Sequence, residues 1–335
     1  MKIEEIVGID ISKQTFDAFI ESKELHSTFE NTPGKFEDFK KWLEKNIGKD
    51  LSGVIIVMEH TGHYSYQLEQ YLHAQELVFS KVGGLEIKRS LGLARGKSDK
   101  IDAKRIAEYG ADKKKKLKVT AEEDKVAFKL KNLISLRDKL VRDKAGYQAR
   151  MKEQQTCLGC ADDDPLLKIQ ASIISSLEER VKELEEMIQQ LIRSNEPTSK
   201  NYDLLTSIKG VGPVLATYTI AYTGNFTRFK NPRQFACFVG IAPFPYKSGT
   251  SVKGKTKVSP LANKKIKSIL YLSASSAAQY NGELKAYYKR RLAEGKTEMS
   301  TLNVIRNKIV ARMFAVVRKQ NKYSAEIPTT KNLTN

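Results

Sequence analysis

Two aspartates three residues apart open a helical stretch, and together they could hold a metal ion. They lie in Lys97-Ser98-Asp99-Lys100-Ile101-Asp102, which runs into the helix-forming sequence 103–109. On a helix, residues three apart share a face with about 5–6 Å between their Cβ atoms, so two carboxylates there favour a cation between them. Carboxylate oxygens suit Mg²⁺. The same pattern also fits an ordinary solvated first turn, where the helix dipole favours acids.

Two further acids each end a short run of β-branched residues. Asp10 ends Val7-Gly8-Ile9-Asp10, and Glu59 ends the run 54–59. Such runs are typical of buried parallel strands, and open α/β sheets bind their ligands at the carboxyl ends of the strands. We therefore expect Asp10, Glu59, Asp99 and Asp102 to converge as a two-metal site that cleaves phosphodiesters. Carboxylates without a cluster of cysteine or histidine favour Mg²⁺ or Mn²⁺ over zinc.

The elements that position these acids read as an α/β domain over residues 1–115. Strands are expected at 5–10, 15–20, 25–31, 54–59 and 77–82, and helices at 34–46 and 64–74. Three strands followed by βα alternation is the order of a ribonuclease H-like sheet. Actin-like ATPases share this order, but the turn at 11–15 lacks their glycine-rich phosphate hairpin. The stretch 92–98 has three residues between its glycines where a Walker A loop needs four, which argues against nucleotide hydrolysis.

Residues 116–200 predict a coiled-coil hairpin of two long helices, at about 122–155 and 165–195. The second helix carries a heptad seam in which Gln170 is the one polar residue; its apolar members are Leu167, Ile174, Leu177, Val181, Leu184, Ile188 and Leu191. β-branched residues at a with leucine at d favour two-stranded pairing, so we expect a homo-oligomer, a dimer or tetramer, through this seam. Cys157 and Cys160 in the turn offer two ligands where structural zinc needs four. Incidental thiols and a zinc site shared between protomers both stay open.

The charge of the chain predicts a polyanionic partner. Its formal net charge is +19, and no acid occurs between Asp203 and Glu283, where eleven basic residues lie. A stretch this long without acids predicts a track for nucleic acid. No apolar run is long enough to span a bilayer, the start lacks the apolar core of a signal peptide, and three cysteines fit a reducing cytoplasm. Nucleic acid is therefore favoured over a membrane surface.

Residues 201–335 predict a mainly α-helical domain. The stretch 204–216 reads as helix, Gly-x-Gly turn and helix, which resembles a helix-hairpin-helix but also fits an ordinary helical turn. Four aromatic residues of the acid-free stretch could stack on bases or pack in a core: Phe226, Phe229, Phe244 and Tyr246. The segment 240–250 reads as a flexible, cationic loop containing a serine. A closing helix is expected at 302–319 and a loose tail at 321–335.

Three motifs together resemble the DEDD transposases of the insertion sequence one-ten family. They are Val7-Gly8-Ile9-Asp10-Ile11-Ser12-Lys13, Glu59-His60-Thr61-Gly62-His63-Tyr64 and Lys97-Ser98-Asp99-Lys100-Ile101-Asp102-Ala103. The segment Gly240–Thr250 resembles the C-terminal motif of the same family, Gly-x-x-Pro followed by Ser-Gly. The resemblance spans nearly the whole chain and implies a RuvC-like ribonuclease H fold at the N-terminus. It assigns the metal-binding tetrad to Asp10, Glu59, Asp99 and Asp102, and the nucleophile to Ser248, with Ser251 and Ser259 as local alternatives.

The resemblance implies a metal-dependent transposase or site-specific DNA recombinase with a covalent serine intermediate. A structured non-coding RNA, a bridge RNA, would pair with target and donor double-stranded DNA. Such a protein works in the prokaryotic cytoplasm, on the nucleoid when active. Nucleic-acid contacts are expected from Arg95, Lys97, Lys209, Lys247, Lys253, Lys255, Lys257, Lys264 and Lys265. Two alternatives stay open: a Holliday-junction resolvase or other ribonuclease H-like nuclease that uses water, with Ser248 structural, and an architectural nucleic-acid-binding protein.

Overall fold

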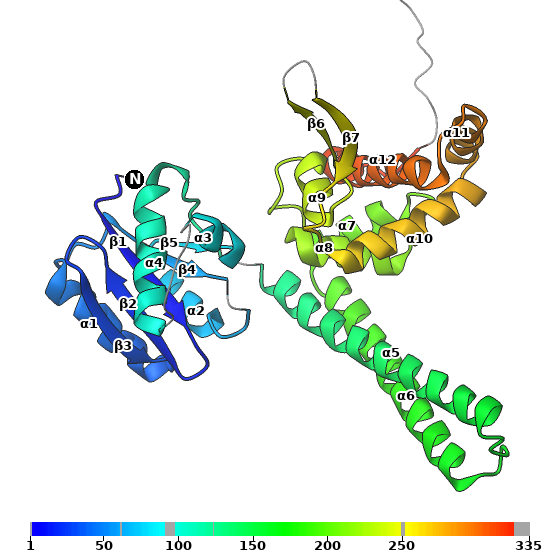
Figure 1. Cartoon of the computed structure of the whole chain (residues 1–335), viewed down its shortest axis with the longest axis horizontal. Helices are drawn as coiled ribbons and strands as arrows, with labels where there is room; N and C mark the ends of the chain where they lie inside the picture. Colours follow the sequence, from blue (N-terminus) through cyan, green and yellow to red (C-terminus); the bar gives the residue numbers. More distant parts are fainter. Residues whose placement is uncertain (1, 61, 91–97, 123, 249–251, 325–335) are drawn as a thin grey trace, which may run out of the picture. The chain divides into compact units, whose positions relative to one another are not determined.

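Figure 1 shows the computed structural model of the chain, which describes residues 2–60, 62–90, 98–122, 124–248 and 252–324. The chain forms two compact units, Met1–Glu122 and Glu123–Asn335. The predicted boundaries at 115 and 200 stay a prediction, since the helical hairpin and the helices after it share one core. No helix among the described residues is long and apolar enough to cross a membrane.

A mixed five-stranded sheet forms the centre of the first unit, in the order β3-β2-β1-β4-β5. β1 and β3 run antiparallel to β2, whereas β4 runs parallel to β1 and β5 parallel to β4. The strands are β1 (Glu5–Ile11), β2 (Thr15–Ile20), β3 (Leu25–Glu30), β4 (Val54–Glu59) and β5 (Phe79–Val82). All five predicted strands are confirmed, although β5 starts two residues later than expected. This topology is compatible with the predicted ribonuclease H-like domain.

Helices cover both faces of this sheet. They are η1 (Pro33–Lys35), α1 (Phe36–Asn46), α2 (Tyr66–Ala74), α3 (Gly84–Ser90), α4 (Asp99–Asp112) and η2 (Lys114–Lys116). Phe39 of α1 and Leu72 of α2 are buried in one core with Phe16 and Ile56 of the sheet. Ile106 of α4 and Ile87 of α3 are buried in a second core on the other face. The short helix α3 is missing from the sequence prediction.

Two glycines let α4 lie directly on the sheet. A Cβ on Gly8 of β1 would come within 2.3 Å of the backbone atoms Ala103 O and Ala107 N. A Cβ on Gly110 would meet Ile6 Cγ2 at 2.8 Å. Only glycine permits this approach of helix to strand. Because the start of α4 lies beside Gly8 and its end beside Ile6, the helix runs antiparallel to β1 and begins near the carboxyl end of that strand.

In the second unit, the helices α5 (Lys125–Cys157) and α6 (Pro165–Arg193) lie along each other as an antiparallel pair (Figure 1). Ion pairs join them, with Arg137 Nη2 2.5 Å from Glu185 Oε1 and Lys144 Nζ 3.4 Å from Glu178 Oε1. Every predicted seam position of α6 is buried or half-buried. The polar member Gln170 donates a hydrogen bond to Gln154 of α5 at 2.7 Å. The predicted seam is therefore covered within its own chain, and oligomerisation through it stays a prediction.

Six further helices and the base of the α5–α6 pair share a core. The helices are α7 (Glu196–Thr206), α8 (Pro213–Thr223), α9 (Pro232–Val239), α10 (Lys264–Tyr280), α11 (Gly282–Ala293) and α12 (Glu298–Lys319). Leu130 of α5 and Ile192 of α6 are buried with Leu215, Leu270 and Ile309. The closing helix α12 is confirmed, four residues longer at its start than expected. The predicted tail lies mostly outside the described residues.

A two-stranded antiparallel hairpin, β6 (Pro243–Ser248) and β7 (Val252–Val258), replaces the predicted flexible loop. The prediction of a loop was wrong because proline, glycine and lysine are all depleted in strands, and prolines at 243 and 245 remove two N–H donors. The register shifts between Phe244 and Tyr246, where Pro245 of β6 faces two residues of β7, Lys255 and Thr256, so that the bulge lies on β7. Ser248 is thus the last residue of a strand, paired in register with Val252.

Candidate functional site

Four carboxylates come to the same edge of the first unit from three elements. Asp10 lies near the end of β1, Glu59 ends β4, and Asp99 and Asp102 lie in the first turn of α4. Parallel pairing of β1 with β4 brings the first two to one edge of the sheet. The contact of α4 with Gly8 brings the start of that helix to the same edge.

The electrostatics of Asp10 show that the four groups influence one another. Burial is the largest cause that raises the pKa of Asp10 from 3.8 to about 6, and the carboxylates of Asp102, Asp99 and Glu59 contribute to the same rise. A hydrogen bond from the backbone of Ile11 acts in the opposite direction. Negative charge is therefore unfavourable at this edge, and either a proton or a cation relieves it.

The donors fit a hard divalent cation, because all four are carboxylates. Within the part of the chain that the structure describes, no three of the side chains that bind metals are close enough to enclose an ion. Asp102 Oδ1 accepts a hydrogen bond from Arg105 Nη1 at 3.1 Å, which offsets part of its charge. The carboxylates thus lie within electrostatic range of one another without forming a closed ligand set.

The first turn of α4 also has an ordinary structural role. Ser98 is the N-cap of α4, and its hydroxyl accepts a hydrogen bond from Ile101 N at 3.3 Å. Asp99 and Asp102 follow in the first turn, where the helix dipole favours acids. The interpretation as an ordinary helix start therefore holds, and metal binding by the same two acids stays a prediction.

Two residues that sequence reasoning missed also hold the site together. Asn31 donates hydrogen bonds to Ser12 O at 3.0 Å and to Tyr64 O at 2.9 Å, so it joins the turn after β1 to the segment after β4. Gly84 leaves room for Glu59, since a Cβ there would lie 2.1 Å from Glu59 Oε1. The pair of glycines after β5 is a sequence signal for such a close approach, whereas nothing in the sequence marks Asn31.

A buried ion pair supports the segment that follows Glu59. Lys81 Nζ on β5 lies 2.7 Å from Glu69 Oε1 on α2, and both side chains are largely shielded from solvent. Ser65 donates a hydrogen bond to the same Glu69 oxygen at 2.5 Å. This network fixes the start of α2 relative to β5, and with it the path of the chain after β4.

The second unit carries Ser248 on the β6–β7 hairpin. Lys247 and Lys253 are partners in register, one position away from the Ser248–Val252 pair. Of the alternative serines, Ser259 lies after β7, where its hydroxyl accepts a hydrogen bond from Leu261 N at 3.1 Å. Ser251 lies outside the described residues.

The residues predicted to contact nucleic acid differ in their exposure and in their partners. Lys209, Lys257 and Lys264 have exposed side chains, whereas Lys247, Lys253 and Lys255 are placed by their backbone on the two hairpin strands. Lys265 instead forms an ion pair with Asp138 of α5, with 2.9 Å from Nζ to Oδ1, and Asp138 also accepts a hydrogen bond from Tyr218. Arg95 and Lys97 lie outside the described residues.

The aromatic residues of the acid-free stretch separate into packed and exposed ones. Phe226 packs edge-on against Phe314 with 4.9 Å between ring centroids, and Phe229 packs against Phe235 at 5.4 Å. Phe244 and Tyr246 on β6 are 45% and 67% exposed. The sequence left packing and base stacking open for all four, and the structure restricts the stacking option to the hairpin.

Two weaker motifs stay predictions. Cys157 at the end of α5 and Cys160 in the turn before α6 are free thiols, and no metal-binding group of side chains surrounds them among the residues that the structure describes. The Gly-x-Gly turn joins α7 to α8, and Gly210 adopts φ +98° against Ala277. The turn is therefore built around a glycine, as in the predicted helix-hairpin-helix, but packing against α10 accounts for it equally well.

Comparison with known proteins gives matches along most of the chain. Residues 7–155 match a family model described as Transposase, of the IS110 DEDD type, and residues 202–289 match the Transposase IS116/IS110/IS902 family. The chain is 26% identical to the pilin gene-inverting protein of Moraxella bovis over 328 residues, which cover 96% of this chain and 98% of that protein. It is 29% identical to an uncharacterized protein of the insertion element IS110 of Streptomyces coelicolor over 158 residues, 47% of this chain and 38% of that protein.

Proposed function

The chain belongs to the DEDD transposases of the IS110 family, which are enzymes that act on DNA, and we propose that it cuts and rejoins DNA strands for an insertion sequence. In this proposal Ser248 is the nucleophile. The observation that carries the proposal is the convergence of Asp10, Glu59, Asp99 and Asp102 at one edge of a mixed sheet. The pilin gene-inverting relatives support recombination over hydrolysis, since inverting a gene requires the cut strands to be rejoined.

The tetrad would hold one or two divalent cations, Mg²⁺ or Mn²⁺, through the oxygens of its four carboxylates. When bound, the metal supplies charge stabilisation at the scissile phosphate and lowers the pKa of an attacking hydroxyl. A cation would relieve the unfavourable charge of the Asp10 carboxylate, which burial and three other carboxylates oppose. Asp10 would therefore be the central ligand of the group.

Ser248 would attack the scissile phosphorus. Its hydroxyl loses a proton as the new O–P bond forms, and the bridging deoxyribose oxygen leaves and takes up a proton. The product is a phosphoserine diester, so the number of phosphodiester bonds is conserved and rejoining needs no external energy source. The facing pair Lys247 and Lys253 supports this role, since it provides a cationic position next to the serine.

A structured guide RNA would direct this chemistry by pairing with target and donor DNA. The support is electrostatic: the net charge is +19, and the acid-free stretch holds eleven basic residues. Exposed Lys209, Lys257 and Lys264 would contact phosphates of DNA or RNA. We place this activity in the bacterial cytoplasm, on the nucleoid, with a homo-oligomer as the working assembly.

Trapping the covalent intermediate tests the proposal. End-labelled target DNA is incubated with Mg²⁺ and the full chain bound to its RNA, then run on a denaturing gel, and any adduct is mapped by peptide sequencing. The wild type should give an adduct at Ser248. Ser248→Ala should bind DNA normally but give neither adduct nor strand exchange. Asp10→Asn should also give neither product, and its DNA binding, measured in Ca²⁺, should equal that of the wild type. Adducts at Ser259 or a tyrosine would contradict the assignment, and normal cleavage by Ser248→Ala would favour a nuclease that uses water.

RNA that copurifies with the protein tests the guide. Sequencing should yield one structured RNA species with segments complementary to both DNA partners, and ribonuclease treatment should abolish cleavage until that RNA is restored. Full cleavage by RNA-free protein would contradict the guided mechanism and leave the serine chemistry untouched.

A further inference from the structure

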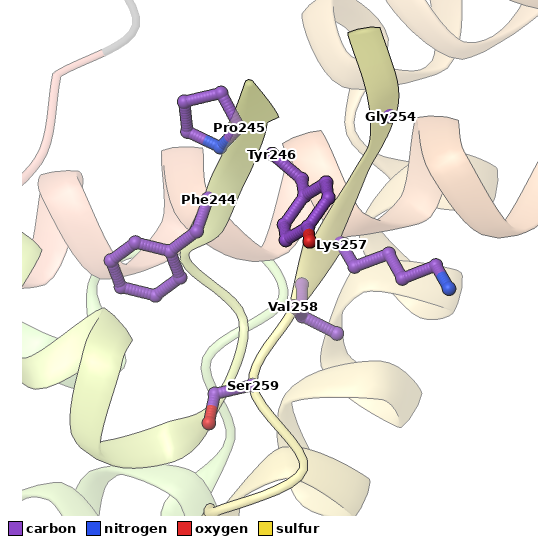
Figure 2. A pocket seen from close by; sticks show the side chains of 7 residues that line it. All are labelled: Phe244, Pro245, Tyr246, Gly254, Lys257, Val258 and Ser259. Carbon is purple, nitrogen blue, oxygen red and sulfur yellow. The ribbon is translucent and has the colours of Figure 1, made fainter. Parts of the chain in front are cut away.

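The β6–β7 hairpin carries a cavity that the chemistry of the tetrad does not use. Its volume is about 470 Å³, and Figure 2 shows the side chains of Phe244, Tyr246 and Lys257 around it. Pockets of a few hundred cubic ångström with mostly apolar walls and few polar groups are typical of ligand sites. The walls here are two aromatic rings, a proline and a valine, and Lys257 and Ser259 supply the polar atoms.

The ring of Tyr246 is held in place by a glycine on the facing strand. Tyr246 and Gly254 are partners in register, and a Cβ on Gly254 would lie 2.6 Å from Tyr246 Cδ1. Any side chain at position 254 would therefore displace the ring. The bulge on β7 lies directly beside Gly254, and bulges commonly re-aim neighbouring side chains. The ring is thus fixed while 67% of the residue stays exposed.

Phe244 is also fixed while remaining exposed. Arg233 of α9 lies over its ring with 5.3 Å from the guanidinium carbon to the ring centroid, and the same arginine donates a hydrogen bond to Pro243 O at 2.8 Å. Neither Phe244 nor Tyr246 stacks on another aromatic ring within the described part of the chain. The exposure of two aromatic rings to water is unfavourable, and a flat partner that stacks on them would remove this apolar surface from water.

The surroundings decide the chemistry of that partner. The hairpin lies in the stretch without acids, its strands carry Lys247, Lys253, Lys255 and Lys257, and its end carries Ser248. A flat aromatic group attached to an anionic backbone matches this combination, since bases stack on aromatic side chains while lysines neutralise phosphates. Tyr246 and Ser248 are two positions apart on one strand, so their backbones are separated by about 6.6 Å.

We propose that Tyr246 and Phe244 form a stacking site for one unpaired nucleobase, which is drawn out of its helix next to the phosphate that Ser248 attacks. This site deepens the proposed function and rests on it for the role of Ser248, but base binding itself does not depend on strand cleavage. The base belongs either to the DNA strand that is cut or to the guide RNA, and both present the same flat heterocycle.

Binding of defined probes in EDTA, where no cleavage occurs, tests the site. The probes are a 20-base-pair DNA duplex, the same duplex with one unpaired 2-aminopurine, and the RNA counterpart of the second. The full chain should bind a bulged probe about 5- to 100-fold more tightly than the paired duplex, which is the range for one base stacked on an aromatic side chain. The fluorescence of the 2-aminopurine in the bulged probe should be quenched when the protein binds. Preference for the DNA bulge identifies the cut strand as the source, and preference for the RNA bulge identifies the guide.

The variants separate stacking from charge and from folding. Tyr246→Ala and Gly254→Val should abolish the preference and the quenching, whereas Tyr246→Phe should keep both because stacking needs only the ring. Tyr280→Ala removes an equally accessible tyrosine, 76% exposed on α10, and should keep the preference. Lys257→Gln should weaken binding of all probes alike. Equal binding of paired and bulged probes by the wild type, or a preference that survives Tyr246→Ala, overturns the stacking site even if the Ser248 adduct is found.

Discussion

The carboxylate of Glu59 occupies the space that a side chain on Gly84 would fill. An ideal Cβ on Gly84 would lie 2.1 Å from Glu59 Oε1 and 2.6 Å from its carboxyl carbon. Gly84 is the first residue of α3, so the end of β4 and the start of α3 can meet only because this position has no side chain. One backbone position outside the tetrad thus decides where a tetrad carboxylate lies.

Replacing Gly84 with alanine should therefore misplace Glu59. We expect strand cleavage by Gly84→Ala to fall about a hundredfold, the cost of displacing a catalytic group by about an ångström. Gly83→Ala is the matched control, because no atom lies within 4 Å of a Cβ placed there. Cleavage rates and thermal unfolding of both variants are measured together. Wild-type cleavage by Gly84→Ala would show that Glu59 does not need this position.

The pKa of Asp10 predicts a pH dependence for the metal-free protein. Its folded-state pKa of about 6 lies above the ordinary value of 3.8. The folded chain therefore holds a proton that the unfolded chain releases in this window, so the contribution of Asp10 to stability falls as pH rises from 3.8 to 6. Asp10→Asn should stabilise the protein at pH 7.5 by on the order of 1–2 kcal/mol, after allowance for solvent screening.

Urea denaturation in EDTA at pH 7.5 and pH 5 measures this effect, and the gain from Asp10→Asn should be smaller at the lower pH. Asp50 provides a control of opposite sign, because hydrogen bonds from the backbone and side chain of Ser52 lower its pKa. Asp50→Asn should therefore give no gain at pH 7.5. A less stable Asp10→Asn protein at pH 7.5 would mean that the four carboxylates do not repel one another as described.

The α5–α6 pair predicts different results for buried and exposed positions of α6. Leu184 is 7% exposed and belongs to the seam that α5 covers, whereas Ile169 is 61% exposed. Leu184→Asp places a charge in that seam and should lower stability by several kcal/mol, on the order of a buried unpaired polar group. Ile169→Asp should leave stability unchanged.

Thermal unfolding and light scattering on the same samples distinguish folding from assembly. If the exposed side of the pair mediates contact between protomers, Ile169→Asp should give a smaller particle at unchanged melting temperature. A folded Leu184→Asp protein of reduced mass would instead place the contact between protomers in the seam itself.

Two adjacent lysines at the start of α10 should differ in their effects. Both side chains are exposed, but Lys265 Nζ also lies 2.9 Å from Asp138 Oδ1 of α5. Lys264→Gln should weaken DNA binding and reduce the slope of log K against log salt by about 1, as expected for one lost phosphate contact. Lys265→Gln should lower the melting temperature and leave the salt slope nearly unchanged. Salt titrations by fluorescence anisotropy measure the slopes, and equal slopes for the two variants would refute the distinction.

The sequence by itself determined the parts of this protein that rest on local patterns. Short β-branched runs predicted the five strands of the first unit, because buried strands need apolar residues in succession. The heptads of α6 predicted the face that is buried or half-buried, because the helical period sets that face. The acids near the ends of β1 and β4 and at the start of α4 were found because they lie at the ends of such local patterns. The family resemblance of the motifs around them is confirmed by the family models.

Only the tertiary structure decided the features that depend on contacts between distant segments. The fit of Glu59 against Gly84, the approach of Gly8 to Ala107 and the bond from Asn31 to Tyr64 join residues that no local pattern connects. The β6–β7 hairpin has the wrong composition for strands and forms because its two segments pair with each other. The pairing of two strands depends on both segments, because the stability that each residue contributes depends on the residue that faces it on the other strand. That is why the sequence indicated only that Tyr246 could stack or pack and did not single out Gly254, whereas the fold places the two residues opposite each other.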